Sequence, residues 1–122
     1  MSFKIQENVQ VQSKVEEEAQ VIVHCSFTSK SELMGIRIWE STVLVDKESN
    51  HRATLMHIEN ISMQPDWTWV LPNKTYRFAL IFSALPKSCS HFDLFEDIPQ
   101  PGGFLVPNIE RNRTDVYRVK LD

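Results

Sequence analysis

The chain has 122 residues, of which 42% are hydrophobic, and this suits one domain spanning residues 1–122 with a single core. Its formal net charge is −3 and its basic residues are scattered along the sequence, so we expect no nucleic-acid partner. No apolar run approaches the roughly 20 residues that a membrane helix needs, so we expect no membrane partner either.

The N-terminal twenty residues contain no apolar block of signal-peptide length. If Met1 is the native start, we therefore expect a soluble, cytoplasmic protein. Apolar residues at odd positions between 3 and 11 predict a first strand, and the acidic run Glu16–Glu18 predicts a turn. Helical periodicity is present only weakly, around residues 15–20.

The remaining elements are predicted as strands, because apolar residues recur at every second position. We expect strands at residues 21–27, 36–45, 52–58, 74–82, 91–96, 104–109 and 117–121, with 36–45 and 52–58 paired as a hairpin. The expected core positions share this period of two; they are Val21, Val23, Phe27, Tyr76, Phe78, Leu80, Phe82, Phe92 and Leu94. Seven to nine short strands with turns between them predict an all-β, antiparallel sandwich.

Three segments carry a family resemblance: MGIRIWESTVLV, WVLPNKTYRFALIF and the stretch from Leu85 to Leu121. The sequence pattern that carries the resemblance is a turn that begins with proline and a strand of the form Tyr76-x-Phe78-x-Leu80-x-Phe82, followed by Leu85-Pro86-Lys87 and Phe92-Asp93-Leu94-x-Glu96. The chain thereby resembles small uncharacterised bacterial proteins and appended modules with an immunoglobulin-like β-sandwich. The resemblance covers about two thirds of the chain and implies a fold and an accessory role, but no catalytic residue.

Two cysteines flank Trp39 with the spacing of an immunoglobulin-type disulfide. The strand phases oppose that pairing, because Cys25 falls on an inward face whereas Cys89 lies an odd number of residues from the inward Phe92. Thiols also stay reduced in a protein without a secretion signal. We therefore expect two free cysteines, with Cys25 shielded and Cys89 accessible.

Cys89, His91 and Asp93 would share one outward face of a strand, which makes them a weak candidate for a metal site. No paired CxxC or HxxxH motif accompanies them, so a solvated strand face is the favoured interpretation and we expect no cofactor. The same residues lack an oxyanion donor, so they predict no thiol enzyme.

Trp39, Trp67 and Trp69 could form an aromatic platform that stacks against sugar rings, although burial between sheets is the commoner fate of tryptophan in a small sandwich. The loop 97–103 is the second candidate surface, because Pro99, Pro101, Gly102 and Gly103 first restrict and then free the backbone. A stiff crossover between sheets is the favoured interpretation of this loop. Residues 62–66 could join it in one loop cluster.

Three N-x-S/T sequons occur, and we interpret their asparagines as turn residues: Asn60, Asn73 and Asn112. No set of residues assembles a nucleophile, a base and an oxyanion donor, so we predict a protein that is not an enzyme. A non-catalytic module that binds another protein or supports a structure is the preferred function. A carbohydrate- or small-ligand-binding module is the alternative, and a metal-dependent or thiol enzyme comes third.

Overall fold

The computed structural model describes residues 19–122, and this part of the chain is all-β. No helix among these residues could cross a membrane. The strand expected at residues 3–11, the acidic turn and most of the weak helical stretch lie outside the described residues. The strands are β1 (Val21–Thr28), β2 (Met34–Ile36), β3 (Thr42–Asp46), β4 (Arg52–Glu59), β5 (Thr68–Val70), β6 (Thr75–Phe82), β7 (His91–Glu96), β8 (Leu105–Glu110) and β9 (Val116–Lys120).

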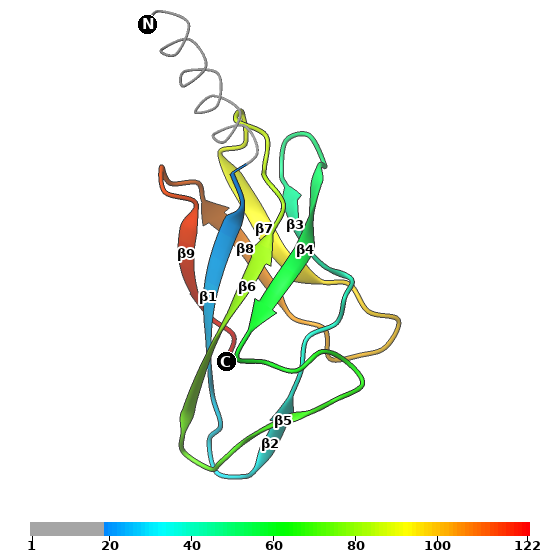
Figure 1. The fold of residues 1–122 in the computed structure, drawn as a ribbon, viewed down its shortest axis with the longest axis vertical. Coiled ribbons are helices and arrows are strands. Elements are labelled where there is room, and N and C mark those ends of the chain that lie inside the picture. The colour runs from blue at the N-terminus through cyan, green and yellow to red at the C-terminus, as the bar shows by residue number, and fades with distance from the viewer. Residues whose placement is uncertain (1–18) are drawn as a thin grey trace, which may run out of the picture.

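Seven of these strands form one mixed sheet in the order β8-β7-β3-β4-β6-β1-β9. The sheet bends until it is nearly closed, so that β9, β1 and β6 form a near layer with β8, β7 and β3 behind it (Figure 1). Every described pairing in this sheet is antiparallel except that of β1 with β9, which run parallel. The expectation of a purely antiparallel arrangement is therefore wrong at this pair.

The sheet turns its corner in β4, which belongs to both layers. Residues 52–54 pair with β3, whereas residues 55–59 pair with β6 after a register shift between Leu55 and His57. A bulge of this kind bends a strand and increases its twist, which is what a closing sheet requires. The predicted hairpin of residues 36–45 and 52–58 is confirmed where β3 pairs with β4.

The core lies between the layers and follows the predicted alternation. Val21, Val23 and Cys25 of β1 are buried, as are Phe92 and Leu94 of β7, whereas Phe27 near the end of β1 is only half-buried and lies outside the core cluster. Phe78, Leu80 and Phe82 of β6 are buried as expected, and Tyr76 is half-buried. Ala79 and Ile81 on the opposite face of β6 are also buried.

A two-stranded ribbon of β2 and β5 forms the end of the molecule opposite the start of β1 (Figure 1). The predicted strand 36–45 is interrupted here, because a turn in which Trp39 O accepts bonds from the N–H and the hydroxyl of Thr42 separates β2 from β3. β5 was not predicted from the sequence. Gly35 pairs with Trp69 across the ribbon.

The three sequon asparagines are confirmed as turn residues. Asn60 and Asn73 adopt φ of 61° and 62°, a left-handed conformation that asparagine tolerates better than most residues. The Asn112 side chain accepts backbone N–H bonds from Thr114 and Asp115, which closes the turn between β8 and β9.

Candidate functional site

An arginine stacked between tryptophans is the centre of the candidate site. The Arg37 guanidinium carbon lies 3.7 Å from the ring centroid of Trp67 and 5.6 Å from that of Trp39. Arg37 Nη1 also donates a hydrogen bond of 3.1 Å to Pro65 O, so the loop 62–66 holds the side chain in place. Cation–π contacts of this type fix the orientation of both partners.

A glycine lets the tryptophans lie close to the β2 backbone. A Cβ added to Gly35 would meet Trp69 Cζ3 at 2.9 Å and Trp67 Cε3 at 3.1 Å, which is too close without a shift of the rings. The two rings are 6.2 Å apart between centroids and tilted by 33°, so they form an angled pair rather than one flat platform.

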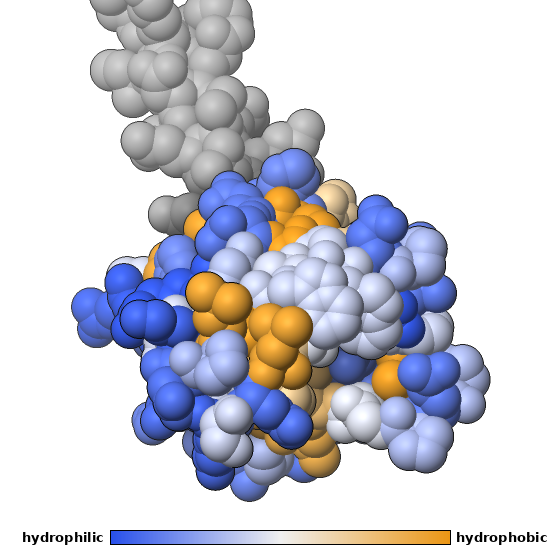
Figure 2. Space-filling view, turned by 90° about the horizontal axis from the view of Figure 1, so that it is seen from below, coloured by the Kyte–Doolittle hydropathy of each residue, from blue (hydrophilic) through white to orange (hydrophobic). Residues whose placement is uncertain are grey.

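The ribbon exposes an apolar surface that we call the tryptophan end, made of Leu33, Trp67, Trp69 and Leu71 with Arg37 beside them. The two tryptophans are 49% and 59% exposed, and both leucines are more than half exposed. Figure 2 looks at this end of the molecule, where orange and pale residues occupy the middle of the face and blue, hydrophilic residues surround them. Burial between sheets, the commoner fate of tryptophan, does not apply to this pair.

A cavity of about 350 Å³ opens beside the tryptophan end. It brings together the two candidate surfaces predicted from the sequence, because Trp39 and Trp67 line it together with Pro101 and Gly102 of the loop 97–103. That loop joins β7 to its neighbour β8 as a hairpin, so the favoured interpretation as a crossover between sheets is wrong. Pro99 and Gly103 are exposed nearby but do not line the cavity, and neither does Trp69.

A buried carboxyl group faces this cavity. Glu96, the last residue of β7, is 5% exposed, and its Oε2 accepts a bond of 3.4 Å from the Trp39 backbone N–H. Loss of solvent on burial raises the pKa of Glu96 to about 6, against the opposing effects of backbone N–H bonds and of the positive charge on Arg37. The cavity thus combines aromatic faces, a carboxyl group and a guanidinium group, which is the chemistry of a binding site.

The Glu96 carboxyl predicts a pH-dependent loss of stability. Because its folded pKa lies above the value of 4.5 that applies to the unfolded chain, the folded state binds more protons between pH 4.5 and 6. The unfolding free energy should therefore fall as the pH rises through that window, by roughly 2 kcal/mol in all. Urea denaturation at pH 4.5 and pH 7.5 measures this effect. Relative to the wild type, the unfolding free energy of Glu96→Gln should be higher at pH 7.5 than at pH 4.5 by about this amount. The same free-energy difference between the two proteins at both pH values would contradict a raised pKa of Glu96.

Glu96 and Arg37 were missed in the search for site residues, although the pattern contains a signal for one of them. Glu96 continues the inward phase of Phe92 and Leu94, so strict alternation places a carboxyl on the core side. A charge at an inward position is costly and often serves a function. No comparable signal marks Arg37, because its role depends on Pro65 and Trp67 in the connection between β4 and β5.

The side chains of the weak metal-site candidate, Cys89, His91 and Asp93, do not come together at one point. His91 is exposed and lies near Ser90, whereas Asp93 bonds Lys47 Nζ and the Asn108 N–H. Within residues 19–122, no group of three or more His, Cys, Asp or Glu side chains could hold a metal ion.

Both cysteines are free, as predicted, but the exposure predicted for Cys89 is wrong. Cys89 is only 3% exposed because it precedes β7 in a turn, where its N–H bonds Pro86 O, so the strand phase does not extend to it. Burial raises the pKa of the Cys89 thiol to about 11 and that of Cys25 to about 12. Neither thiol is thereby prepared as a nucleophile.

Comparison of the chain with protein-family models, with curated proteins and with solved structures finds no match.

Proposed function

We propose that the chain is a non-catalytic module that binds another protein through the tryptophan end. The observation that carries the proposal is the exposed pair Trp67 and Trp69, with Arg37 stacked on Trp67. Two exposed leucines accompany them, Leu33 just before β2 and Leu71 just after β5. Tryptophan and arginine are enriched at the energetic centres of protein interfaces, whereas scattered single apolar residues are ordinary on a surface.

Protein is preferred over carbohydrate because of the shape of the surface. The tryptophan rings are tilted by 33° and flanked by the aliphatic Leu33 and Leu71, so no flat platform for a sugar ring results. An interface core combines such aromatic and aliphatic anchors with a polar rim.

The family relation suggested by the sequence remains part of this proposal. Two layers of strands that share β4 support an immunoglobulin-like sandwich of the kind found in bacterial accessory modules, although the parallel pair of β1 and β9 departs from a purely antiparallel one. Such a scaffold binds through its surfaces and needs no reactive residue, which supports a role outside catalysis.

Site-specific photocrosslinking in the source cell tests the proposal. A benzophenone side chain at position 71 should crosslink one polypeptide, whereas the same group at position 105 should not, because Leu71 and Leu105 are similarly exposed at 62% and 54% but only Leu71 belongs to the tryptophan end. Trp69→Ala should reduce the crosslinked product by about 30-fold or more, since a central aromatic anchor contributes about 2 kcal/mol or more to binding.

The proposal fails if the crosslink forms equally at both positions, or if Trp69→Ala leaves its yield unchanged. Leu105→Ala serves as the matched surface control and should leave the yield at position 71 intact. Both variants should retain the unfolding midpoint of the wild type within a few degrees, because each truncates an exposed side chain.

A small-ligand or carbohydrate site is the second candidate, and the cavity beside the tryptophan end favours it. Glu96, Gln100 and Trp39 line that cavity with hydrogen-bonding groups and an aromatic surface. Titration with soluble hexasaccharides would then change the tryptophan fluorescence in a saturable way, and Trp39→Ala would abolish the change. Absence of any saturable response leaves protein binding as the sole candidate of the two.

A further inference from the structure

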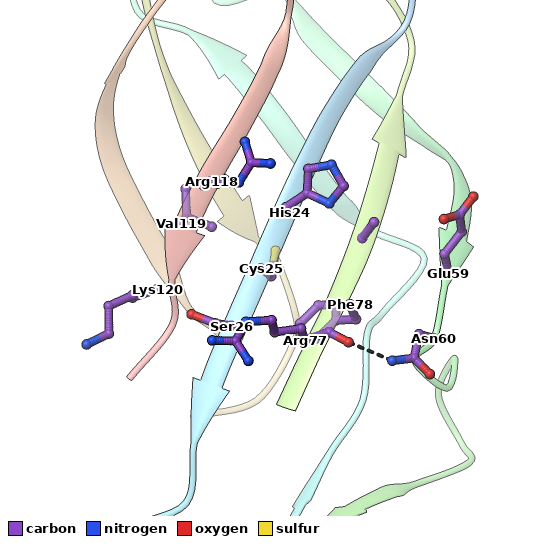
Figure 3. Close-up of a pocket in the computed structure, with 11 residues that line it drawn as sticks. His24, Cys25, Ser26, Glu59, Asn60, Arg77, Phe78, Arg118, Val119 and Lys120 are labelled. Atoms are coloured by element: carbon purple, nitrogen blue, oxygen red, sulfur yellow. Dashed lines mark hydrogen bonds between the residues drawn. The ribbon is translucent and has the colours of Figure 1, made fainter. Parts of the chain in front are cut away.

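A second groove lies on the outer face of the near layer, across β9, β1 and β6. It has a volume of about 490 Å³ and shares only Phe78 with the cavity beside the tryptophan end. Ser26 and Ala79 line it as its smallest side chains, between longer ones on the neighbouring strands. Figure 3 shows these strands side by side, with His24 and Ser26 on the middle strand between residues of β9 and β6.

Strand register gathers basic side chains around this groove. His24 lies beside Arg118, and Ser26 lies between Arg77 and Lys120. Side chains at these positions stand on the outward face, since the alternate residues Val23 and Cys25 point into the core. In Figure 3 the guanidinium group of Arg77 extends over Ser26, and that of Arg118 lies at the level of His24.

The basic residues that line the groove form no ion pair within the described part of the chain. The ion pairs found among residues 19–122 engage other cations, namely Lys47, Arg52 and Arg111. Among residues 19–122, Glu59 on the β4 side is the one acidic residue that lines the groove. A cationic face on a chain with a net charge of −3 favours an anionic ligand at this place.

We propose that this groove binds an acidic peptide segment of a partner protein in an extended conformation. Arg118 and Lys120 are two residues apart on β9, a separation of about 6.6 Å that equals the distance between alternate residues of an extended peptide. Carboxylates at alternate positions can therefore meet both cations at once, and Arg118 can bind one of them with two parallel hydrogen bonds.

Charge complementarity favours a peptide over a nucleic acid. Glu59 places a negative charge on one wall, which repels a continuous phosphate backbone but tolerates a peptide whose acidic residues face β9. This site is separate from the tryptophan end, so the proposal stands or falls independently of the function proposed above.

Fluorescence anisotropy with the full chain tests the inference. The probe is a labelled ten-residue peptide of alternating glutamate and serine, measured at 20 mM and 150 mM salt. The wild type should bind it, and Arg118→Gln with Lys120→Gln should weaken binding about tenfold, because charge-assisted contacts are lost. The matched control, Lys87→Gln with Arg113→Gln, removes the same charge from exposed sites outside the groove and should weaken binding less than twofold.

Equal weakening by the two double variants would show that net charge alone attracts the peptide, and this overturns the proposal. So does equal or tighter binding of a ten-nucleotide single strand, or the absence of peptide binding at 20 mM salt. Far-ultraviolet circular dichroism establishes that each variant is folded. Lys120→Glu, a single substitution at an exposed position, is a second variant that disrupts the groove.

Discussion

Replacing Phe92 by alanine should lower the unfolding free energy by about 3–5 kcal/mol, the range found when a buried phenylalanine is truncated. Phe92 is fully buried in β7, and its ring meets that of Tyr117 at 4.9 Å in an edge-to-face arrangement of 82°. The substitution removes contacts between the two layers and leaves a cavity that the surrounding strands can fill only in part.

Urea denaturation measures this loss, and Phe95→Ala is the matched control. Phe95 lies on the same strand and carries the same side chain, but it faces away from the core and is only half-buried. We expect its loss to cost clearly less than that of Phe92. An equal or larger cost for Phe95 would contradict the assignment of the inward face of β7.

The alternation of apolar and polar residues predicted the core strands because it is a local property of each segment. Each strand that carries Val23, Leu80 or Leu94 has its inward face set by the period of two in its own sequence. The boundaries of β7 agree with the prediction, and those of β1, β6, β8 and β9 differ by about one residue. Burial of one face is sufficient to fix these elements.

Pairings between distant segments could not be predicted in the same way. The parallel contact of β1 with β9 joins Ile22 to Val116 across almost the whole described chain, and no sequence period encodes it. β5 has only three residues, Thr68–Val70, and exposes Trp69, so it presents no buried alternation. Gly35, which pairs with Trp69, did not indicate a strand either, because glycine is disfavoured in strands.

The candidate site was predicted in pieces. Tryptophan identity indicated an aromatic surface, and the density of proline and glycine indicated a functional loop, yet neither pattern could reveal that Trp39 and Pro101 line the same cavity. Glu96 could have been found from strand phase alone. Arg37 could not, because its stacking geometry arises from the packing of β2 against the β4–β5 connection.

A partly buried polar cluster lies between the ends of the nearly closed sheet. Arg111 forms two bonds to Asp115, of 2.6 and 3.0 Å, and donates to the carbonyl oxygens of Pro86 and Cys89. Tyr117 donates its hydroxyl proton to Asp115 at 2.9 Å and accepts from the Asn112 N–H. Burial raises the Tyr117 pKa to about 12, so the hydroxyl remains a donor at neutral pH.

Arg111→Ala should therefore lower the unfolding free energy by about 2–3 kcal/mol, as expected when a largely buried, charge-assisted pair loses one partner and leaves the other unpaired. The Arg111 and Asp115 side chains are only 17% and 15% exposed, so solvent screens their interaction weakly. Arg113→Ala, two residues away on the exposed turn, should change stability by less than about 0.5 kcal/mol.

A double-mutant cycle of Arg111→Ala with Asp115→Ala separates this pair from its surroundings. Positive coupling is expected, but Arg111→Ala should cost more than Asp115→Ala, because only the arginine also bonds the carbonyls that precede β7. Those bonds connect the loop before β7 to the turn between β8 and β9. These two strands are the edges of the seven-stranded sheet. If Arg111→Ala and Asp115→Ala lower the unfolding free energy equally, the cluster stabilises only the turn between β8 and β9. The contact between Phe92 and Tyr117 would then be the one that holds the two layers together at this place.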